Sequence, residues 1–208
     1  MTETWRCFVA VPMPPGLRAT LQAAVETWRA EPMAPDLRWT DPAGWHLTLS
    51  FLGPVRVEDL QAIERAIAAA ASRGTAEPLW AGGLGVFPTP RRARVLWYGV
   101  ADEHGSLGAL ARDLRDRLTP LVPRLAGESP SRAHVTLARA RVGRGIDLGS
   151  WLEAHAAPAG AMPVDRLILY RSHPGGRGPA RYEPLGFAPL GGADWVRSDV
   201  GAEASVHG

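Results

Sequence analysis

Two tetrapeptides of one pattern carry the side chains best suited to chemistry, His46-Leu47-Thr48-Leu49 and His134-Val135-Thr136-Leu137. Residues two apart in an extended strand point to the same face of the sheet. Each motif therefore presents an imidazole beside a hydroxyl on one face and two apolar side chains on the other. One such strand carries little information. Two of them, in separate halves of the chain, predict a site built from two related lobes that face each other.

Two histidines on opposite walls of a cleft can divide acid and base work, because an imidazole has an unperturbed pKa of about 6.5. Phosphodiester cleavage needs a base to deprotonate the attacking water and an acid to protonate the departing oxygen. Thr48 and Thr136, on the same faces as the imidazoles, can donate hydrogen bonds to non-bridging phosphate oxygens. The remaining histidines have no spacing typical of metal ligands. We therefore expect neither a metal nor another cofactor.

Two arginines beside the second motif are candidates for binding phosphate. Arg132 has the same strand parity as His134, so it can face the site. Arg139 has the opposite parity and reaches the site only if a bulge or the strand end intervenes. Either side chain could equally be a solvated surface group. The sequence has no Lys, so all 23 of its basic residues are Arg, whose planar guanidinium binds phosphate with two parallel hydrogen bonds.

Hydrophobic periodicity predicts a mixture of strands and helices. Strands are expected at 7–11, 38–39, 45–52, 79–87, 95–100, 133–140, 166–172 and 181–185, and helices at 16–28, 57–73, 105–118 and 147–157. Several neighbouring strands lack a helix between them, which favours antiparallel or mixed sheets in an α+β fold. The order strand, helix, motif strand, helix, strands occurs twice along the chain.

The motifs lie within a longer pattern. It comprises Arg6–Pro12, Arg38-Trp39, Trp45–Gly53, Phe87-Pro88, Arg94–Trp97, Ala133–Arg139, Tyr170–Ser172 and Arg181-Tyr182. This pattern resembles the two-histidine (2H) phosphoesterase superfamily, and most closely its bacterial RNA 2′,3′-cyclic phosphodiesterase branch, also called 2′-5′ RNA ligases. The resemblance covers most of residues 6–186.

The resemblance implies a fold and an activity. The fold is α+β, with two pseudo-symmetric lobes, each an antiparallel sheet with helices on its outer face, and an active-site cleft between them. The activity is opening of an RNA 2′,3′-cyclic phosphate to a 2′-phosphomonoester without a metal. His46 would protonate the leaving 3′ oxygen, His134 would activate water, and Thr48 and Thr136 would hold the phosphate. Arg132 and Arg139 are the further substrate-binding candidates.

Four aromatic residues near the motifs could stack on bases: Trp45, Phe51, Phe87 and Trp97. Trp45 shares its parity with the core-facing leucines, so we expect it in the core. Residues 1–188 are expected to form one bilobal domain. Residues 189–208 are polar and rich in Gly and Ala, and we expect them to form a loosely ordered tail.

The composition indicates the cellular compartment in which the protein is expected to act. A single cysteine, Cys7, excludes an internal disulfide and fits a reducing compartment. The start of the chain does not read as a signal peptide, and no apolar run approaches the roughly 18 residues of a membrane span. We expect a cytoplasmic monomer that acts on RNA ends or small cyclic nucleotides. Alternatives are joining or cleavage of 2′-5′ linkages, a non-catalytic nucleotide- or RNA-binding module, and a scaffold with buried histidines.

Overall fold

The structure is a computed structural model that describes residues 2–75, 77–127, 132–175, 180–192 and 194–198. Its helices are α1 (Pro15–Trp28), α2 (Leu60–Ala71), α3 (Ser106–Leu118) and α4 (Gly149–Ala154). Its strands are β1 (Thr4–Pro12), β2 (Leu37–Trp39), β3 (His46–Arg56), β4 (Glu77–Phe87), β5 (Val95–Ala101), β6 (His134–Ala140), β7 (Gly160–Val164), β8 (Arg166–His173), β9 (Arg181–Pro189) and β10 (Val196–Arg197). The predicted α+β fold is confirmed.

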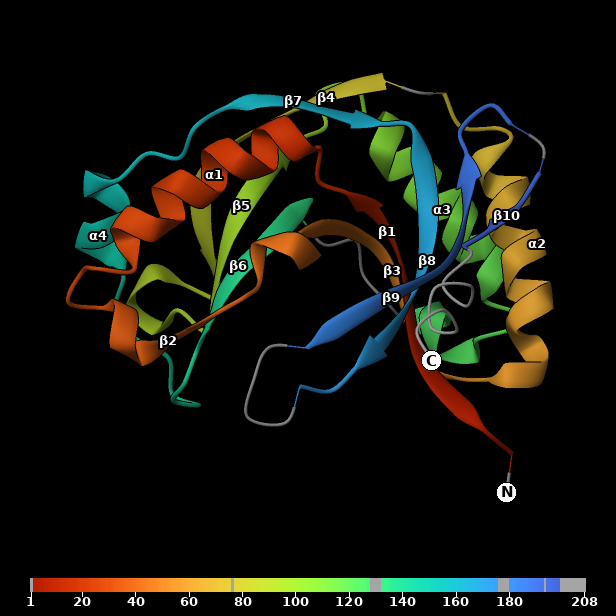
Figure 1. Cartoon of the computed structure of the whole chain (residues 1–208), viewed down its shortest axis with the longest axis horizontal. Helices are drawn as coiled ribbons and strands as arrows, with labels where there is room; N and C mark the ends of the chain where they lie inside the picture. Colours follow the sequence, from red (N-terminus) through yellow and green to blue (C-terminus); the bar gives the residue numbers. More distant parts are fainter. Residues whose placement is uncertain (1, 76, 128–131, 176–179, 193, 199–208) are drawn as a thin grey trace, which may run out of the picture.

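The strands form two antiparallel groups that meet at one point (Figure 1). We call β10-β9-β8-β1-β3 the terminal lobe, and β6-β5-β4-β7 together with β2 the middle lobe. β3 and β6, the two motif strands, are the neighbours at the junction, and they share a single backbone pair, Leu47 with Val135. Both of these side chains are 1% exposed. The apolar positions of the motifs therefore form the seam between the lobes, and the motif histidines lie just before it.

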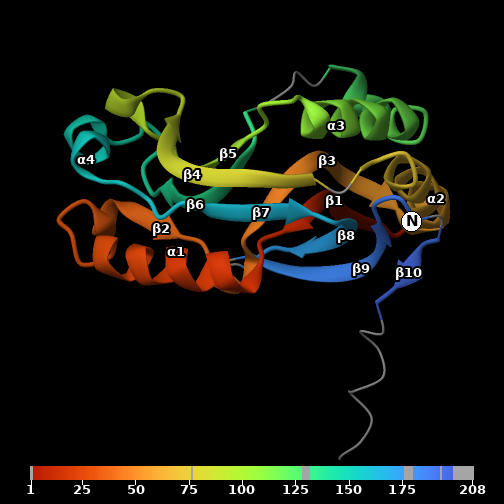
Figure 2. The same ribbon diagram turned by 90° about the horizontal axis from the view of Figure 1, so that it is seen from above.

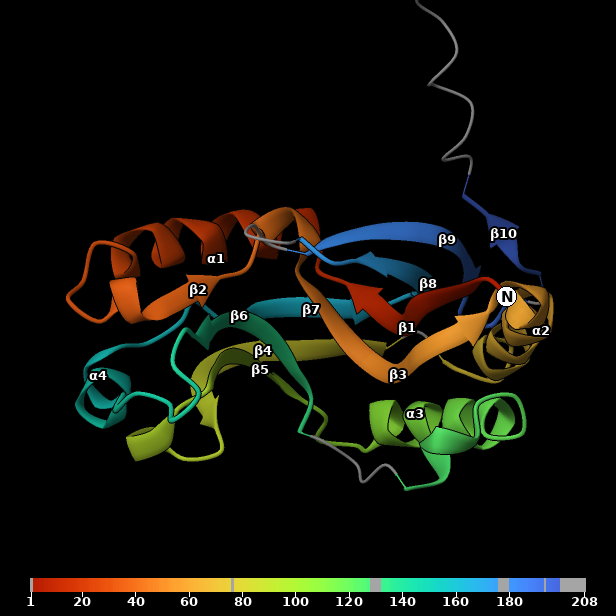
Figure 3. The same cartoon turned by 90° about the horizontal axis from the view of Figure 1, so that it is seen from below.

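Helices α1 and α3 each pack against the lobe other than the one that contains the strand before them in the sequence. α1 follows β1 of the terminal lobe but packs against β7, whereas α3 follows β5 of the middle lobe but packs against α2 and β3. Figures 1 and 3 show α1 and α4 beside the middle lobe and α2 and α3 beside the terminal lobe. Figure 2 shows α1 and α3 on opposite sides of the molecule. Neither lobe is therefore built from one continuous stretch of sequence.

The helices form because their apolar residues recur on one face. Leu21 and Val25 of α1, Ile63 and Ile67 of α2, and Leu114 and Leu118 of α3 are fully buried. The two residues of each pair lie four positions apart, on one face of their helix, and each face covers a sheet or a neighbouring helix. The part of the chain that the structure describes contains no helix long and apolar enough to cross a membrane.

Several strands are longer than expected, such as β3, which continues to Arg56 instead of ending at 52, and three further segments differ from the sequence-based expectation. β7 was not predicted, because Gly160 and Pro163 make its sequence untypical of a strand, yet both are tolerated at the edge of a sheet. The predicted helix at 147–157 is shorter, since α4 spans only Gly149–Ala154. In the predicted tail, Val196–Arg197 pairs with β9, whereas 193 and 199–208 lie outside the described residues.

Candidate active site

The two motifs come together in one cavity between the lobes. His46 and Thr48 project from β3, His134 and Thr136 project from β6, and all four line a cavity of about 520 Å³ that we call the motif cavity. Its other lining residues are Arg6, Phe8, Thr40, Gly44, Trp45, Phe51, Arg139, Ser172 and Tyr182. The fold thus assembles the four side chains that the alternating pattern singled out.

Both imidazoles are held in the same way. Nδ1 of His46 lies 2.6 Å from the carbonyl oxygen of Gly44, and Nδ1 of His134 lies 2.8 Å from that of Arg132. Because a carbonyl oxygen only accepts, each Nδ1 must carry the proton and donate it. Nε2 is then the nitrogen left for chemistry in each ring. The contact is to the residue two positions earlier in both motifs, so the likeness of the motifs extends to their backbone bonds.

Aromatic side chains form the wall behind His46. Its ring stacks on Phe8 with centroids 4.6 Å apart and meets the edge of Tyr182 at 5.0 Å. Phe8 in turn stacks on Tyr170, at 5.2 Å. Three strands supply these residues, β1, β8 and β9, and sequence reasoning missed all three as site residues. Their pairing registers decide which side chains reach His46, and a single sequence does not reveal those registers.

Two of the predicted aromatics form the wall behind His134. The ring of Phe87 meets it edge-on at 5.0 Å, and that of Trp97 lies 6.3 Å away. Trp45 is 3% exposed, as its parity predicts, and its indole nitrogen donates to the Thr40 hydroxyl at 2.8 Å. Both histidines are therefore half-buried among aromatic rings while still lining the cavity.

This setting lowers the pKa of both imidazoles. Burial is the largest cause and takes the pKa of His46 down to about 4, while the hydrogen bond to Gly44 acts the other way and the nearby His134 lowers it further. Burial also lowers the pKa of His134, opposed by its bond to Arg132 and assisted by the charge of Arg139. Both rings are consequently neutral at pH 7 when no anion is present, and His134 has a free lone pair at Nε2.

A β-bulge explains how Arg139 reaches the cavity. Along β6, Thr136 pairs with Trp97 but Ala138 pairs with the adjacent Leu96, so Leu137 is an extra residue. Such an insertion reverses the strand parity beyond it. Leu137 and Ala138 are accordingly both buried, and Arg139 lines the motif cavity. The sequence analysis required a bulge or the strand end for Arg139 to reach the site, and the structure contains the bulge.

The first motif contains the same bulge. Along β3, Ser50 pairs with Val9 and Thr48 with the adjacent Ala10, so Leu49 is the extra residue. The reversal brings Phe51 into the cavity. Phe51 and Arg139 both stand five residues after their histidines, so the two lobes place an aromatic ring and a guanidinium at matching positions.

A second cavity opens from the same groups. It also has a volume of about 520 Å³, and it shares Thr48, Phe51, His134, Thr136 and Arg139 with the motif cavity. It extends along α3, and we call it the α3 groove. Arg132 lines this groove rather than the motif cavity, with its guanidinium 5.4 Å above the Trp97 ring. Arg139 thus lines both cavities together with His134, whereas Arg132 lines only the α3 groove.

Thr40 joins the two motif strands. Its hydroxyl lies 2.9 Å and 2.8 Å from the carbonyl oxygens of Thr136 and Leu137, and its backbone N–H donates to Leu137 at 2.8 Å. The same hydroxyl accepts the bond from Trp45, the residue before His46. One side chain thus connects the start of β3 to the bulge of β6.

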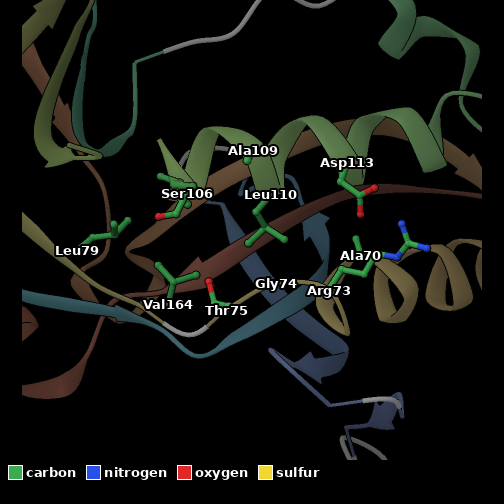
Figure 4. Close-up of a pocket in the computed structure, with 11 residues that line it drawn as sticks. Ala70, Arg73, Gly74, Thr75, Leu79, Ser106, Ala109, Leu110, Asp113 and Val164 are labelled. Atoms are coloured by element: carbon green, nitrogen blue, oxygen red, sulfur yellow. The ribbon is translucent and has the colours of Figure 1, made fainter. Parts of the chain in front are cut away.

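A separate cavity of about 250 Å³ lies between α2 and α3 (Figure 4). Arg73 and Asp113 stand at one end of it, and Leu79 and Val164 stand toward the other. It contains none of the motif residues. Among the described residues, no three His, Cys, Asp or Glu side chains are grouped as metal ligands.

Comparisons with known proteins agree with this geometry. A family model described as "LigT like Phosphoesterase" matches residues 11–97. A protein of Geobacillus stearothermophilus named RNA 2′,3′-cyclic phosphodiesterase is 28% identical over 93% of this chain, which spans 60% of that protein's length. A protein of the same name from Archaeoglobus fulgidus is 31% identical over 65% of this chain and 73% of its own.

A solved structure gives the same result at the level of the fold. The crystal structure of Escherichia coli LigT in apo form is similar with a TM-score of 0.70 and 26% identity, over 91% of this chain and 99% of the other. The same E. coli protein has also been solved in complex with 3′-AMP. The chain therefore belongs to the LigT-like phosphoesterases, the two-histidine (2H) family of enzymes.

Proposed function

We propose that this enzyme hydrolyses RNA 2′,3′-cyclic phosphate ends to 2′-phosphomonoesters, with His46 as the acid and His134 as the base and without a metal. The observation that carries the proposal is the matched pair of imidazoles. Both line one cavity, and both have Nδ1 bonded to a backbone carbonyl so that Nε2 is available. The choice of which histidine is the acid follows the family resemblance.

The two histidines are sufficient for every proton transfer in the proposed reaction. Nε2 of His134 takes a proton from water as the water oxygen attacks phosphorus. The bond between phosphorus and the 3′ oxygen breaks, and Nε2–H of His46 gives that oxygen its proton. The product is a 2′-phosphomonoester beside a 3′ hydroxyl. A proton moving between the histidines through solvent then restores the starting state.

The charge on the phosphate is met by neutral and cationic donors. Thr48 and Thr136 line the cavity on the same faces as the imidazoles, where their hydroxyls can donate to the non-bridging oxygens. Arg139 supplies a guanidinium on the side of His134. The bound anion also favours protonation of His46, whose pKa is about 4 in the free protein.

The relatives support this choice of substrate. Both of those described above are named RNA 2′,3′-cyclic phosphodiesterase, and E. coli LigT, which has a similar fold, was solved in complex with the nucleotide 3′-AMP. The same pair of imidazoles could also act on 2′-5′ linkages, which is the alternative within the family.

The decisive experiment uses an oligoribonucleotide that ends in a 2′,3′-cyclic phosphate, incubated with the enzyme in EDTA. We expect a product that carries only a 2′-phosphate, identified by phosphorus NMR. Loss of activity in the chelator would contradict a metal-free reaction. A 3′-phosphate product would contradict the assignment of the leaving oxygen, and turnover of 2′-5′-linked dinucleotides alone would favour the alternative.

Replacement of either histidine tests the acid–base pair. We expect His46→Ala and His134→Ala each to lower kcat by about 10²-fold or more, the scale of general acid–base catalysis. Unchanged folding, measured by circular dichroism, is the control. Tight nucleotide binding with no product from the wild-type protein would indicate a binding module instead.

A further inference from the structure

The α3 groove differs in chemistry from the motif cavity, although the two share one set of reacting groups. Arg112, Arg115, Arg132 and Arg139 line it, and Asp102 is its only acidic lining residue among those described. The whole chain has 23 basic and 21 acidic residues, so four guanidinium groups against one carboxylate is a local concentration of positive charge. A polyanion is the ligand that such a groove favours.

The one carboxylate in the groove is engaged by the backbone. The oxygens of Asp102 accept hydrogen bonds from the N–H groups of Leu107 and Gly108, at 3.1 Å and 2.8 Å. These bonds stabilise the first turn of α3, whose N–H groups have no partner within the helix. The position of Asp102 in the groove is thus explained by its role at the start of α3.

Arg112 lies along the groove rather than away from it. Its Nη1 is 3.5 Å from the position that a Cβ of residue 108 would occupy, so its side chain extends back over Gly108 toward the start of α3. Buried Leu107 and the small residues Gly108 and Ala111 provide an apolar floor. An apolar floor with an arginine rim suits the sugar, base and phosphate of a nucleotide strand.

The two cavities also offer more room than one terminal nucleotide needs. Each has the size of a pocket for a small ligand, roughly 300–1,000 Å³, and they meet at Thr48, Thr136 and His134. With a phosphate held at that junction, the aromatic motif cavity suits the terminal base. The α3 groove then remains for what is attached to the terminal nucleotide.

We propose that the α3 groove binds the RNA strand on the 5′ side of the reacting nucleotide, with Arg112 contacting a backbone phosphate, so that the substrate is an oligonucleotide rather than a mononucleotide. This inference rests on the proposed function, because it takes the cyclic phosphate at the junction as given. It adds a substrate length and a residue that neither motif identifies.

The test compares cytidine 2′,3′-cyclic phosphate with a tetranucleotide that ends in the same group. We expect kcat/KM of the wild-type enzyme to be at least 10-fold higher for the tetranucleotide at low salt. Arg112→Gln should lower the ratio of the two kcat/KM values about fivefold, the scale of one exposed phosphate contact. Arg112→Lys keeps the charge and should restore most of the ratio.

Arg65→Gln is the matched control, because it removes the same charge from an exposed position on α2 that lines neither cavity of the cleft. It should leave the ratio unchanged. Equal kcat/KM values for the two substrates would overturn the inference. So would an equal effect of the Arg112 and Arg65 variants, or an Arg112→Gln effect of the same size on both substrates.

A binding measurement separates this inference from the proposed function. Fluorescence anisotropy of a labelled tetranucleotide with a 3′-phosphate end requires no turnover. The slope of log K against log salt should become shallower by about 0.7 in Arg112→Gln, the value for one phosphate contact on a single strand. If no cyclic phosphate is hydrolysed but this slope changes, the proposed function is wrong, whereas the inference that the α3 groove binds an RNA strand through Arg112 is supported. An unchanged slope overturns the groove.

Discussion

The pKa of His46 should rise steeply when a phosphate enters the motif cavity. Burial holds it at about 4 in the free protein, so only about one molecule in 10³ has this ring protonated at pH 7. Raising the pKa to 7 requires about 4 kcal/mol, at ~1.36 kcal/mol per unit. A unit negative charge ~4 Å from the imidazolium supplies about 4 kcal/mol at an effective dielectric constant of ~20. Bound phosphate is therefore sufficient to make His46 an acid at neutral pH.

Nitrogen NMR of the histidine rings between pH 4 and 8.5 measures this change. His46 is assigned by its absence in His46→Gln, and the ligand is a nucleoside 2′-phosphate, the proposed product. We expect a midpoint near 4 without ligand and near 7 with it. His155 is the internal control, because its Nε2 contacts Glu31 at 2.7 Å outside the cleft. A ligand that shifts the His134 signals but leaves His46 near 4 would refute the assignment of His46 as the acid.

The same depressed pKa affects stability, which gives an independent check. The unfolded chain binds a proton at His46 near pH 6.5 and the folded chain only near 4, so the folded state loses stability as the pH falls between these values. The loss at pH 4 amounts to ~3 kcal/mol. His46→Gln should therefore show a smaller fall in its free energy of unfolding between pH 7 and 4.5, measured with urea. Parallel pH curves for variant and wild type would contradict a strongly depressed pKa.

Three further substitutions probe the frame around the histidines. Thr136→Val should lower kcat about 10²-fold, as for loss of one donor to a developing oxyanion, whereas Thr136→Ser should keep most of the activity; equal losses in the two variants would contradict a role that is specific to the hydroxyl. Gly85→Ala should destabilise the fold by about 1–3 kcal/mol, because a Cβ there would overlap the buried indole of Trp97; thermal melting against Gly16→Ala, which has open space around it, checks this. Thr40→Val removes a hydroxyl that bonds two carbonyls of β6 and should lower kcat more than it changes KM, with rescue by Thr40→Ser; steady-state kinetics that show only a raised KM would contradict this positioning role.

The alternating motifs made much of the site predictable. Over the first three residues of each motif a period of two settles which face each side chain takes, and the paired motifs indicated that His46 and His134 share a cavity. The apolar partners Leu47 and Val135 are buried at the seam, as the same alternation requires. Local pattern was sufficient because it alone determines these orientations.

What remained unpredictable depends on contacts between distant strands. Nothing in the sequence of β6 identifies Leu137 as the extra residue of a bulge. The sequence could therefore say only that Arg139 would face the site if a bulge were present. The wall of Phe8, Tyr170 and Tyr182 around His46 depends on the registers of three strands. The exchange of α1 and α3 between lobes was equally hidden, because an amphipathic face does not specify which sheet it will cover.

The division of the terminal lobe between the two ends of the chain has a consequence for biosynthesis. β1 and β3 leave the ribosome early, but β8 and β9, which belong to the same lobe, are made only after β4 to β7. Tyr170 and Tyr182 arrive with them and enclose the ring of His46. A nascent chain shorter than about residue 190 should therefore lack both a complete terminal lobe and the aromatic wall around His46. Limited proteolysis of stalled ribosome–nascent chains of increasing length should find protection of residues 4–56 only once β9 has emerged; earlier protection would contradict this order.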